Sequence, residues 1–90
     1  MVSQKVTIKN PSGLHVGPAG FLCQTAMKFD SKITFSSGKG TESNAKSFLS
    51  VLGAGIRFGD ELEFFCEGSD EEAALAEMVH AVENGLEDFA

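Results

Sequence analysis

The chain has 90 residues and a formal net charge of −6 at pH 7, with 42% hydrophobic and 22% charged residues. This composition is too apolar for intrinsic disorder, and the length suits one small core, so we expect residues 1–90 to form a single domain. The longest apolar run is broken by glycines and falls far short of the about 20 residues that span a bilayer, which predicts no membrane insertion. The first residues lack a basic leader with an apolar stretch, so we expect a cytoplasmic protein.

Charge is distributed unevenly along the chain. Residues 1–59 contain all seven bases and two acids, a net +5, whereas residues 60–90 contain eleven acids and no Lys or Arg, a net −11. An acidic chain without a basic cluster is a poor candidate for nucleic acid, because that binding relies on Lys and Arg displacing counterions. We expect instead a molecule with two differently charged faces, the more basic of which suits an acidic protein partner.

The spacing of cysteines and histidines indicates no metal site. Cys23 and Cys66 each lie in an apolar pattern, where a reduced thiol serves as a small hydrophobic side chain. His15 and His80 are far apart in the sequence, and there is no CxxC or HExxH motif. We therefore predict two reduced cysteines, no metal and no cofactor.

The first half of the chain predicts a strand, a helix and two further strands. Alternating apolar residues over residues 2–8 are typical of a half-buried strand, and Asn-Pro-Ser-Gly at residues 10–13 predicts a turn. Helical spacing follows over residues 16–29, with Pro18 in the first turn. A strand at residues 33–35 then leads through a glycine-containing turn to a short polar strand at residues 41–43. The predicted buried stripe of the helix is Ala19, Leu22, Cys23, Ala26 and Phe29, with Gln24, Thr25 and Lys28 opposite.

The second half predicts a helix, a strand and a helix. Ser47 is a natural N-cap for a short helix from Phe48 that ends by residue 53 or 55. Apolar residues alternate again over residues 61–67, and Ser-Asp-Glu-Glu at residues 69–72 resembles a capping box before helical spacing from Leu75 to Phe89. The order β-α-β-β-α-β-α predicts an α+β fold, with helices on one face of a largely antiparallel four-stranded sheet.

His15 is the residue with the clearest chemical meaning, because it follows the turn and directly precedes the first predicted helix. Unpaired N–H groups at a helix N-terminus form a seat for an anion such as phosphate. A positive charge is disfavoured there, which favours a neutral imidazole with the free lone pair that a nucleophile toward phosphorus requires. Gly17 lets the backbone approach a phosphoryl group, and Pro18 fixes the turn. The alternative is that His15 is an ordinary polar loop residue near a cap.

The run Gly-Leu-His-Val-Gly-Pro-Ala at residues 13–19, together with Asn-Ala-Lys-Ser at residues 44–47, resembles HPr, the histidine-containing phosphocarrier family of the bacterial sugar phosphotransferase system. The resemblance extends from about Val2 to Leu86 and includes the element order. It implies an open-faced sandwich with three helices on one face of a four-stranded antiparallel sheet. It also implies that His15 accepts a phosphoryl group on Nδ1 from phosphorylated Enzyme I and passes it to sugar-specific IIA components. Val16, Gly17 and Pro18 are then at the phosphoryl site, and the protein is a carrier rather than an enzyme.

The resemblance gives Ser47 a regulatory role. In Gram-positive members the matching serine is phosphorylated by an ATP-dependent HPr kinase/phosphorylase, and the product binds a catabolite-control transcription regulator. A phosphate at the start of a helix is electrostatically favourable, so modification can change the surface without unfolding the protein. Without the resemblance, a plain N-cap is the simpler interpretation of Ser47.

An apolar patch around His15 is predicted to bind these partners. Phe21 projects close to the polar side of its helix and is expected to be exposed, while a short surface helix cannot bury all of its apolar residues. The resemblance also places partner contacts on the first two helices. His80 is expected to be a surface residue without a catalytic partner, and the protein is expected to be a monomer. The expected partner-binding residues are Gly20, Phe21, Gln24, Lys28, Phe48, Leu49 and Leu52.

Gly17 departs from the family pattern His-x-Arg-Pro-Ala, in which the arginine contacts the phosphoryl group. Losing charge-assisted hydrogen bonds costs about 1.5–3 kcal/mol, or roughly 10- to 100-fold in transfer or affinity. Arg57, Lys46 and Lys28 are candidate replacement cations, and the sequence favours none of them. A rival hypothesis is therefore a regulatory adaptor that acts through phosphorylated Ser47 with little phosphoryl flux. A third, weaker hypothesis is a small enzyme with a cysteine nucleophile.

Overall fold

The computed structural model describes residues 1–38, 41–84 and 86, and its elements follow the predicted order. The sheet order is β1-β4-β2-β3, and every pair of neighbouring strands is antiparallel. The predicted fold class is confirmed. The elements are β1 (Val2–Thr7), α1 (Val16–Met27), β2 (Lys32–Ser36), β3 (Ser43–Asn44), α2 (Phe48–Gly53), β4 (Glu61–Glu67) and α3 (Glu71–Glu83).

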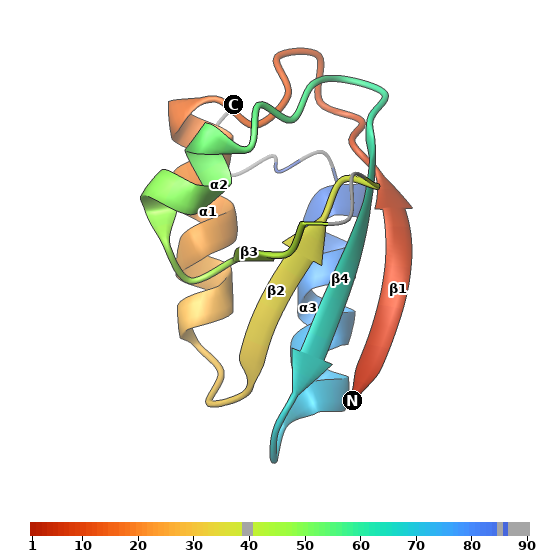
Figure 1. Ribbon diagram of the computed structural model, residues 1–90. Helices are drawn as coiled ribbons and strands as arrows, with labels where there is room; N and C mark the ends of the chain where they lie inside the picture. Colours follow the sequence, from red (N-terminus) through yellow and green to blue (C-terminus); the bar gives the residue numbers. More distant parts are fainter. Residues whose placement is uncertain (39–40, 85, 87–90) are drawn as a thin grey trace.

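The helices cover one face of the sheet, and the core lies between the two layers (Figure 1). α3 packs on β1 and β4, and α1 packs on both α3 and α2. Because side chains alternate across a strand, every second residue of β4 faces the helices and is buried. The sheet supplies Val6, Ile33, Phe35, Leu62, Phe64 and Cys66 to the core, and the helices supply Ala19, Leu22, Ala26, Val51, Met78 and Val82.

The sheet register brings the two charge-rich halves of the chain together. Lys5 of β1 is paired with Glu63 of β4, and Lys32 of β2 is paired with Glu67 of β4. The acidic strand β4 therefore lies between two strands that carry lysines. The predicted segregation into two charged faces is wrong on this surface, because strand pairing places distant segments side by side.

Three predicted details of the first half differ in the structure. Helix α1 ends at Met27, two residues earlier than predicted, and β3 is Ser43–Asn44 instead of residues 41–43. Thr25, predicted on the polar side of α1, is buried because α3 packs against that side. Its hydroxyl donates to the carbonyl oxygen of Phe21 at 2.9 Å, which satisfies the buried polar group.

The end of α3 also differs from the prediction. The helix stops at Glu83, and Leu86 has a positive φ of 55° while its side chain remains buried. Its backbone N–H donates to the carbonyl oxygen of Ala81 at 3.0 Å. The predicted extension to Phe89 lies outside the described residues.

Cys66 is buried and Cys23 is half-buried, and both are free thiols. In the described part of the chain, no helix is long and apolar enough to cross a membrane.

Candidate functional site

His15 is the N-cap residue of α1. Its backbone is extended, with φ −87° and ψ −169°, and its carbonyl oxygen accepts the first helical hydrogen bond from Ala19 N–H at 2.8 Å. The imidazole makes no capping hydrogen bond and is exposed. Within the described residues it has no hydrogen-bond partner, so both ring nitrogens are accessible to another molecule.

The first turn of α1 faces the same solvent. Val16 is exposed, Gly17 is half-buried and Pro18 is buried. The N–H groups of Val16 and Gly17 have no intrahelical acceptor, because the first turn of any helix lacks one, and Pro18 has no N–H. An anion next to the His15 ring would therefore meet two backbone donors and the positive end of the helix dipole.

A tight turn holds His15 in this position. The Asn10 side chain is buried and donates to the carbonyl oxygen of Gly13, whose own N–H donates to the carbonyl oxygen of Asn10 at 3.0 Å. Gly13 has a φ of +66°, which a residue with a Cβ rarely adopts. The predicted turn at residues 10–13 is confirmed, and these bonds show how it orients the chain into α1.

The loop after α2 packs directly on this turn. Leu14 N–H donates to the carbonyl oxygen of Ile56 at 3.0 Å. A Cβ on Gly13 would lie 2.6 Å from that oxygen and 2.8 Å from the Cα of Arg57. The two loops meet at the upper end of the molecule (Figure 1). Nothing in the sequence pattern places Arg57 near the turn that carries His15, because this contact joins loops that are distant in the chain.

The two lysines proposed as replacement cations lie elsewhere. The Lys46 ammonium donates to the carbonyl oxygen of Phe29 at 2.6 Å, beyond the C-terminal end of α1. Lys28 is the C-cap of the same helix. The helix extends by about 1.5 Å per residue, so Lys28 is roughly 20 Å along the axis from His15. Neither lysine can contact a phosphoryl group on His15 in this structure.

Ser47 is the N-cap of α2, as predicted. Its hydroxyl oxygen accepts a hydrogen bond from Ser50 N–H at 3.2 Å, and its carbonyl oxygen accepts from Val51 N–H at 3.0 Å. The side chain is half-buried. The structure thus gives Ser47 a capping role that is independent of any modification.

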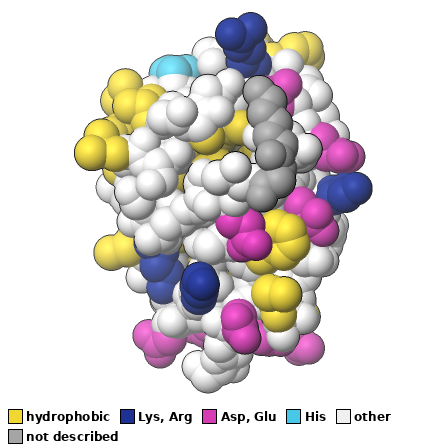
Figure 2. Space-filling model, viewed as in Figure 1, with side chains coloured by type: hydrophobic (Ala, Val, Ile, Leu, Met, Phe, Trp, Pro, Cys, Tyr) yellow, Lys and Arg dark blue, Asp and Glu magenta, His cyan; other side chains and the backbone are white. Residues whose placement is uncertain are grey.

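The predicted apolar patch is present over α2 but does not include Phe21. Leu49 is 76% exposed and Phe48 is 36% exposed, whereas Leu52 is partly buried against the core. The Phe48 ring packs near Gly20, where a Cβ would be 3.8 Å from Cε1. Figure 2 shows hydrophobic side chains at the upper left, next to a histidine at the upper edge.

Phe21 was expected to be exposed, and this is wrong. It is half-buried and packs against the core on the side of α1 that faces α3, where it lines a hollow with Lys28 and His80. The helix pattern could not show this, because the neighbouring α3 covers a side that is polar in the sequence. Gln24 and Lys28 are exposed as expected, and so is His80, whose Nε2 lies 2.8 Å from the Asn84 amide nitrogen.

The described residues contain no cluster of three or more His, Cys, Asp or Glu side chains that could hold a metal ion. The chemistry available near His15 is therefore that of an exposed imidazole, two backbone donors and the adjacent loop of Arg57.

Known proteins resemble this chain over most of its length. Residues 2–84 match a family model described as the PTS HPr component phosphorylation site. The phosphocarrier protein HPr of Mycoplasma genitalium is 37% identical over 79 residues, which cover 88% of this chain and 90% of the relative.

Solved structures agree in fold. The crystal structure of HPr-C-His from Thermoanaerobacter tengcongensis superposes with a TM-score of 0.90 and 35% identity, covering 94% of both chains. Crh, described as a catabolite repression containing protein of Bacillus subtilis, superposes with a TM-score of 0.74 and 30% identity, covering 94% of this chain and 97% of that chain.

Proposed function

Because this chain belongs to the HPr family of phosphocarrier proteins of the phosphotransferase system, we propose that His15 accepts a phosphoryl group from phosphorylated Enzyme I and passes it to sugar-specific IIA components. The observation that carries the proposal is the exposed imidazole at the N-cap of α1, which has no hydrogen-bond partner within the described part of the chain. A phosphocarrier must bind its donor and afterwards its acceptor, and an exposed ring next to a hydrogen-bonded turn is accessible to both.

The transfer step needs few groups from this chain. A lone pair on the His15 imidazole attacks phosphorus, a P–N bond forms, and the bond that holds the phosphoryl group on the donor breaks, with its electron pair staying on the donor atom. The reverse exchange delivers the group to an acceptor. The N–H groups of Val16 and Gly17 stabilise the phosphoryl oxygens, and the helix dipole adds about 0.3–1 kcal/mol for a negative charge at this end. On this basis the protein is a carrier that is consumed and regenerated, with no turnover of its own.

A phosphorylation assay tests this proposal. The protein is incubated with phosphoenolpyruvate, Mg²⁺ and Enzyme I, and its intact mass is measured before and after mild acid treatment. We expect one acid-labile phosphoryl group on the wild type and on His80→Ala, and none on His15→Ala. His80 is a matched control because it is also exposed but lies on α3. Labelling of His15→Ala, or none of the wild type, would contradict the proposal.

Enzyme I and IIA components would bind around His15. The exposed residues Leu49 and Phe48 on α2 provide the apolar part of this surface. Gln24 and Lys28, which are also exposed, extend it with polar groups farther along α1. Phe21 contributes less to this binding surface than its sequence position suggested, because it is half-buried. Leu49→Glu is expected to slow phosphorylation by Enzyme I, because it places a charge in the apolar part of this surface.

Regulatory phosphorylation at Ser47 is a second part of the proposal. Ser47 is half-buried, and its hydroxyl oxygen accepts one hydrogen bond, from Ser50 N–H, which leaves a second lone pair for attack on a phosphoryl group. Incubation with ATP and an HPr kinase should give one acid-stable phosphate that is absent from Ser47→Ala and present on Ser50→Ala. Acid stability distinguishes this product from phosphorylated His15.

The resemblance to Crh favours one alternative, a regulatory adaptor that acts through phosphorylated Ser47 and carries little phosphoryl flux. Gly17, which offers no side-chain cation, points the same way. For an adaptor, His15→Ala leaves binding to a catabolite-control regulator unchanged, while Ser47→Ala abolishes it. Rapid labelling of His15 by Enzyme I would exclude this alternative.

A further inference from the structure

We infer that Arg57 binds the phosphoryl group on His15 and replaces the side-chain cation that Gly17 does not provide. This inference rests on the proposed phosphorylation of His15. A bound phosphoryl group carries more than one negative charge near neutral pH, and Gly17, where the family has an arginine, offers it only a backbone N–H group. A guanidinium adds a full charge and a planar fork of donors that fits phosphate oxygens.

The backbone contact between the two loops places Arg57 close enough. The Cα of Arg57 lies 2.8 Å from the position of a Cβ on Gly13, and Leu14 is hydrogen-bonded to Ile56. Two chain steps separate Gly13 from His15, which is at most about 7 Å between their Cα atoms. At this separation of the two backbones, the long Arg57 side chain can reach a group attached to the His15 ring.

The loop that carries Arg57 is held in a defined shape. Arg57 N–H donates to Asp60 Oδ2 at 2.9 Å, and Asp60 N–H donates to the carbonyl oxygen of Arg57 at 3.0 Å. The next residues are tied to the end of β1, because Gly59 N–H donates to the carbonyl oxygen of Ile8 at 2.9 Å. The backbone of Arg57 is thus fixed, while its side chain is exposed.

The guanidinium is available to a new anion. Arg57 lines a hollow with Lys5, Asp60 and Glu61, yet within the described residues the one ion pair joins the amino group of Met1 to Glu71. No carboxylate in this part of the chain therefore has to be displaced from Arg57 before it turns toward His15. Figure 2 shows that a Lys or Arg side chain and a histidine both lie at the upper edge of the molecule, with other atoms between them.

The other described cations do not compete. Lys46 is bound to Phe29 and Lys28 lies at the opposite end of α1. Lys9 follows β1 and precedes the turn, so it provides a matched control. It is exposed and cationic, and within the described residues no hydrogen bond joins it to Gly13 or Leu14.

The test compares initial rates of His15 phosphorylation by phosphoenolpyruvate and Enzyme I in a rapid-quench assay. We expect Arg57→Ala to be 10- to 100-fold slower than wild type, the loss typical of a charge-assisted contact, and Lys9→Ala to be unchanged. Gly17→Arg added to Arg57→Ala should restore the rate. If Arg57→Ala is as fast as Lys9→Ala while the wild type is phosphorylated, the role of Arg57 is overturned and the proposed function stands. If the wild type is not phosphorylated, the proposed function itself fails.

A second measurement separates contact from a general structural effect. The ³¹P resonance of the phosphorylated protein is followed through a pH titration. A guanidinium beside the phosphoryl group favours its more negative form, so removal of Arg57 should raise the apparent pKa of the phosphoryl group relative to Lys9→Ala. Equal titration curves for the two variants would overturn the assignment, and circular dichroism confirms that both are folded.

Discussion

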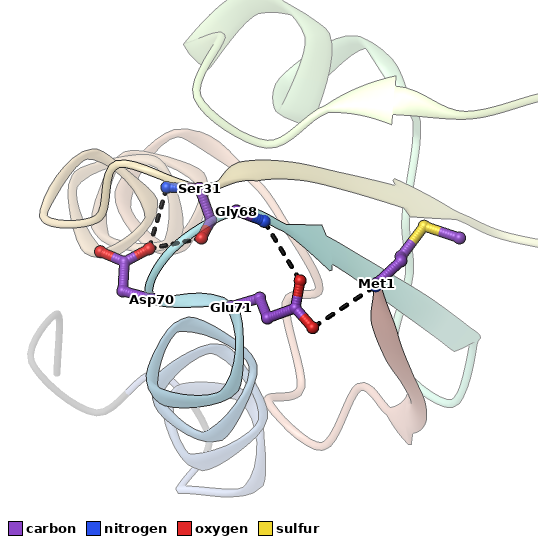
Figure 3. Close-up of polar contacts among 5 residues, drawn as sticks. All are labelled: Met1, Ser31, Gly68, Asp70 and Glu71. Atoms are coloured by element: carbon purple, nitrogen blue, oxygen red, sulfur yellow. Dashed lines mark hydrogen bonds and ion pairs between the residues drawn. The ribbon is translucent and has the colours of Figure 1, made fainter.

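The carboxylate of Asp70 accepts hydrogen bonds from both the backbone N–H and the hydroxyl of Ser31, a residue 39 positions earlier in the chain (Figure 3). The N–H distance is 2.9 Å, and Asp30 N–H donates to the other carboxylate oxygen at 3.0 Å. Asp70 is the N-cap residue of α3, yet its side chain makes no capping bond. It ties the start of α3 to the turn between α1 and β2.

This arrangement corrects the predicted capping box at residues 69–72. Glu71, not Glu72, reaches back, and its Oε1 accepts from Gly68 N–H at 3.2 Å while its Oε2 pairs with the amino group of Met1 at 3.4 Å (Figure 3). Gly68 lies close to Ser31, since a Cβ there would be 2.7 Å from the Ser31 Cα. The sequence shows acids at a helix start, but not the distant turn that they bind.

Asp70→Asn is expected to lower the free energy of unfolding near neutral pH and to reduce its dependence on pH in the acid range. The hydrogen bonds from Ser31 and Asp30 lower the pKa of Asp70 below its ordinary value of 3.8. A carboxyl with a lowered folded-state pKa stabilises the protein above its unfolded-state pKa, and this contribution is lost as the pH falls through the folded-state value. Urea unfolding near neutral pH and at about pH 3 measures the change. A profile identical to that of Glu72→Gln, a neighbour without such contacts, would contradict the assignment.

Gly13→Ala is expected to destabilise the fold and slow phosphorylation of His15. The added methyl group collides with the carbonyl oxygen of Ile56 and the Cα of Arg57, so the two loops must separate. Gly59→Ala is the control, because Gly59 also has a positive φ of 87° but its Cβ would meet nothing within 4 Å. Both variants carry the backbone penalty of about 1–2 kcal/mol, and only the first adds overpacking of about 1–3 kcal/mol. Urea unfolding of both, with the phosphorylation assay, checks this; equal losses would show that the loop contact is unimportant.

The two thiols are expected to differ in reactivity. Burial raises the pKa of Cys66, and the charges of Glu71 and Asp70 raise it further, so this thiol has little thiolate at neutral pH. Cys23 is half-buried and its sulfur donates to the carbonyl oxygen of Lys46 at 3.4 Å. A thiol reagent should label Cys23 first and Cys66 only upon unfolding. This is measured by comparing Cys23→Ser with Cys66→Ser, and rapid labelling of native Cys23→Ser would contradict the buried position of Cys66.

Local pattern predicted the elements well, because strand alternation and helical spacing arise from burial within each element. The turn at residues 10–13 and the Ser47 cap could be predicted for the same reason, because their hydrogen bonds join residues only three positions apart. Phe21, Thr25 and Arg57 were misplaced or left undecided because their surroundings come from other elements: α3 covers one side of α1, and the loop after α2 packs on Gly13. Local pattern thus predicts His15 and its helix, whereas the position of Arg57, the cation that we propose for this site, depends on tertiary contacts.

Ser47→Ala is expected to lower the free energy of unfolding by about 1 kcal/mol, because it removes the N-cap bond to Ser50 N–H. Ser47→Asp retains an acceptor at the cap and should stay close to wild type. Ser50→Ala is a matched control, since it deletes a hydroxyl from the same helix but keeps the backbone donor. Urea unfolding of the three variants tests this order. If Ser47→Ala were as stable as Ser50→Ala, the cap would contribute nothing. The expected order instead implies that a Ser47 phosphate, which retains acceptor oxygens at this position, alters the α2 surface while leaving the helix start bonded.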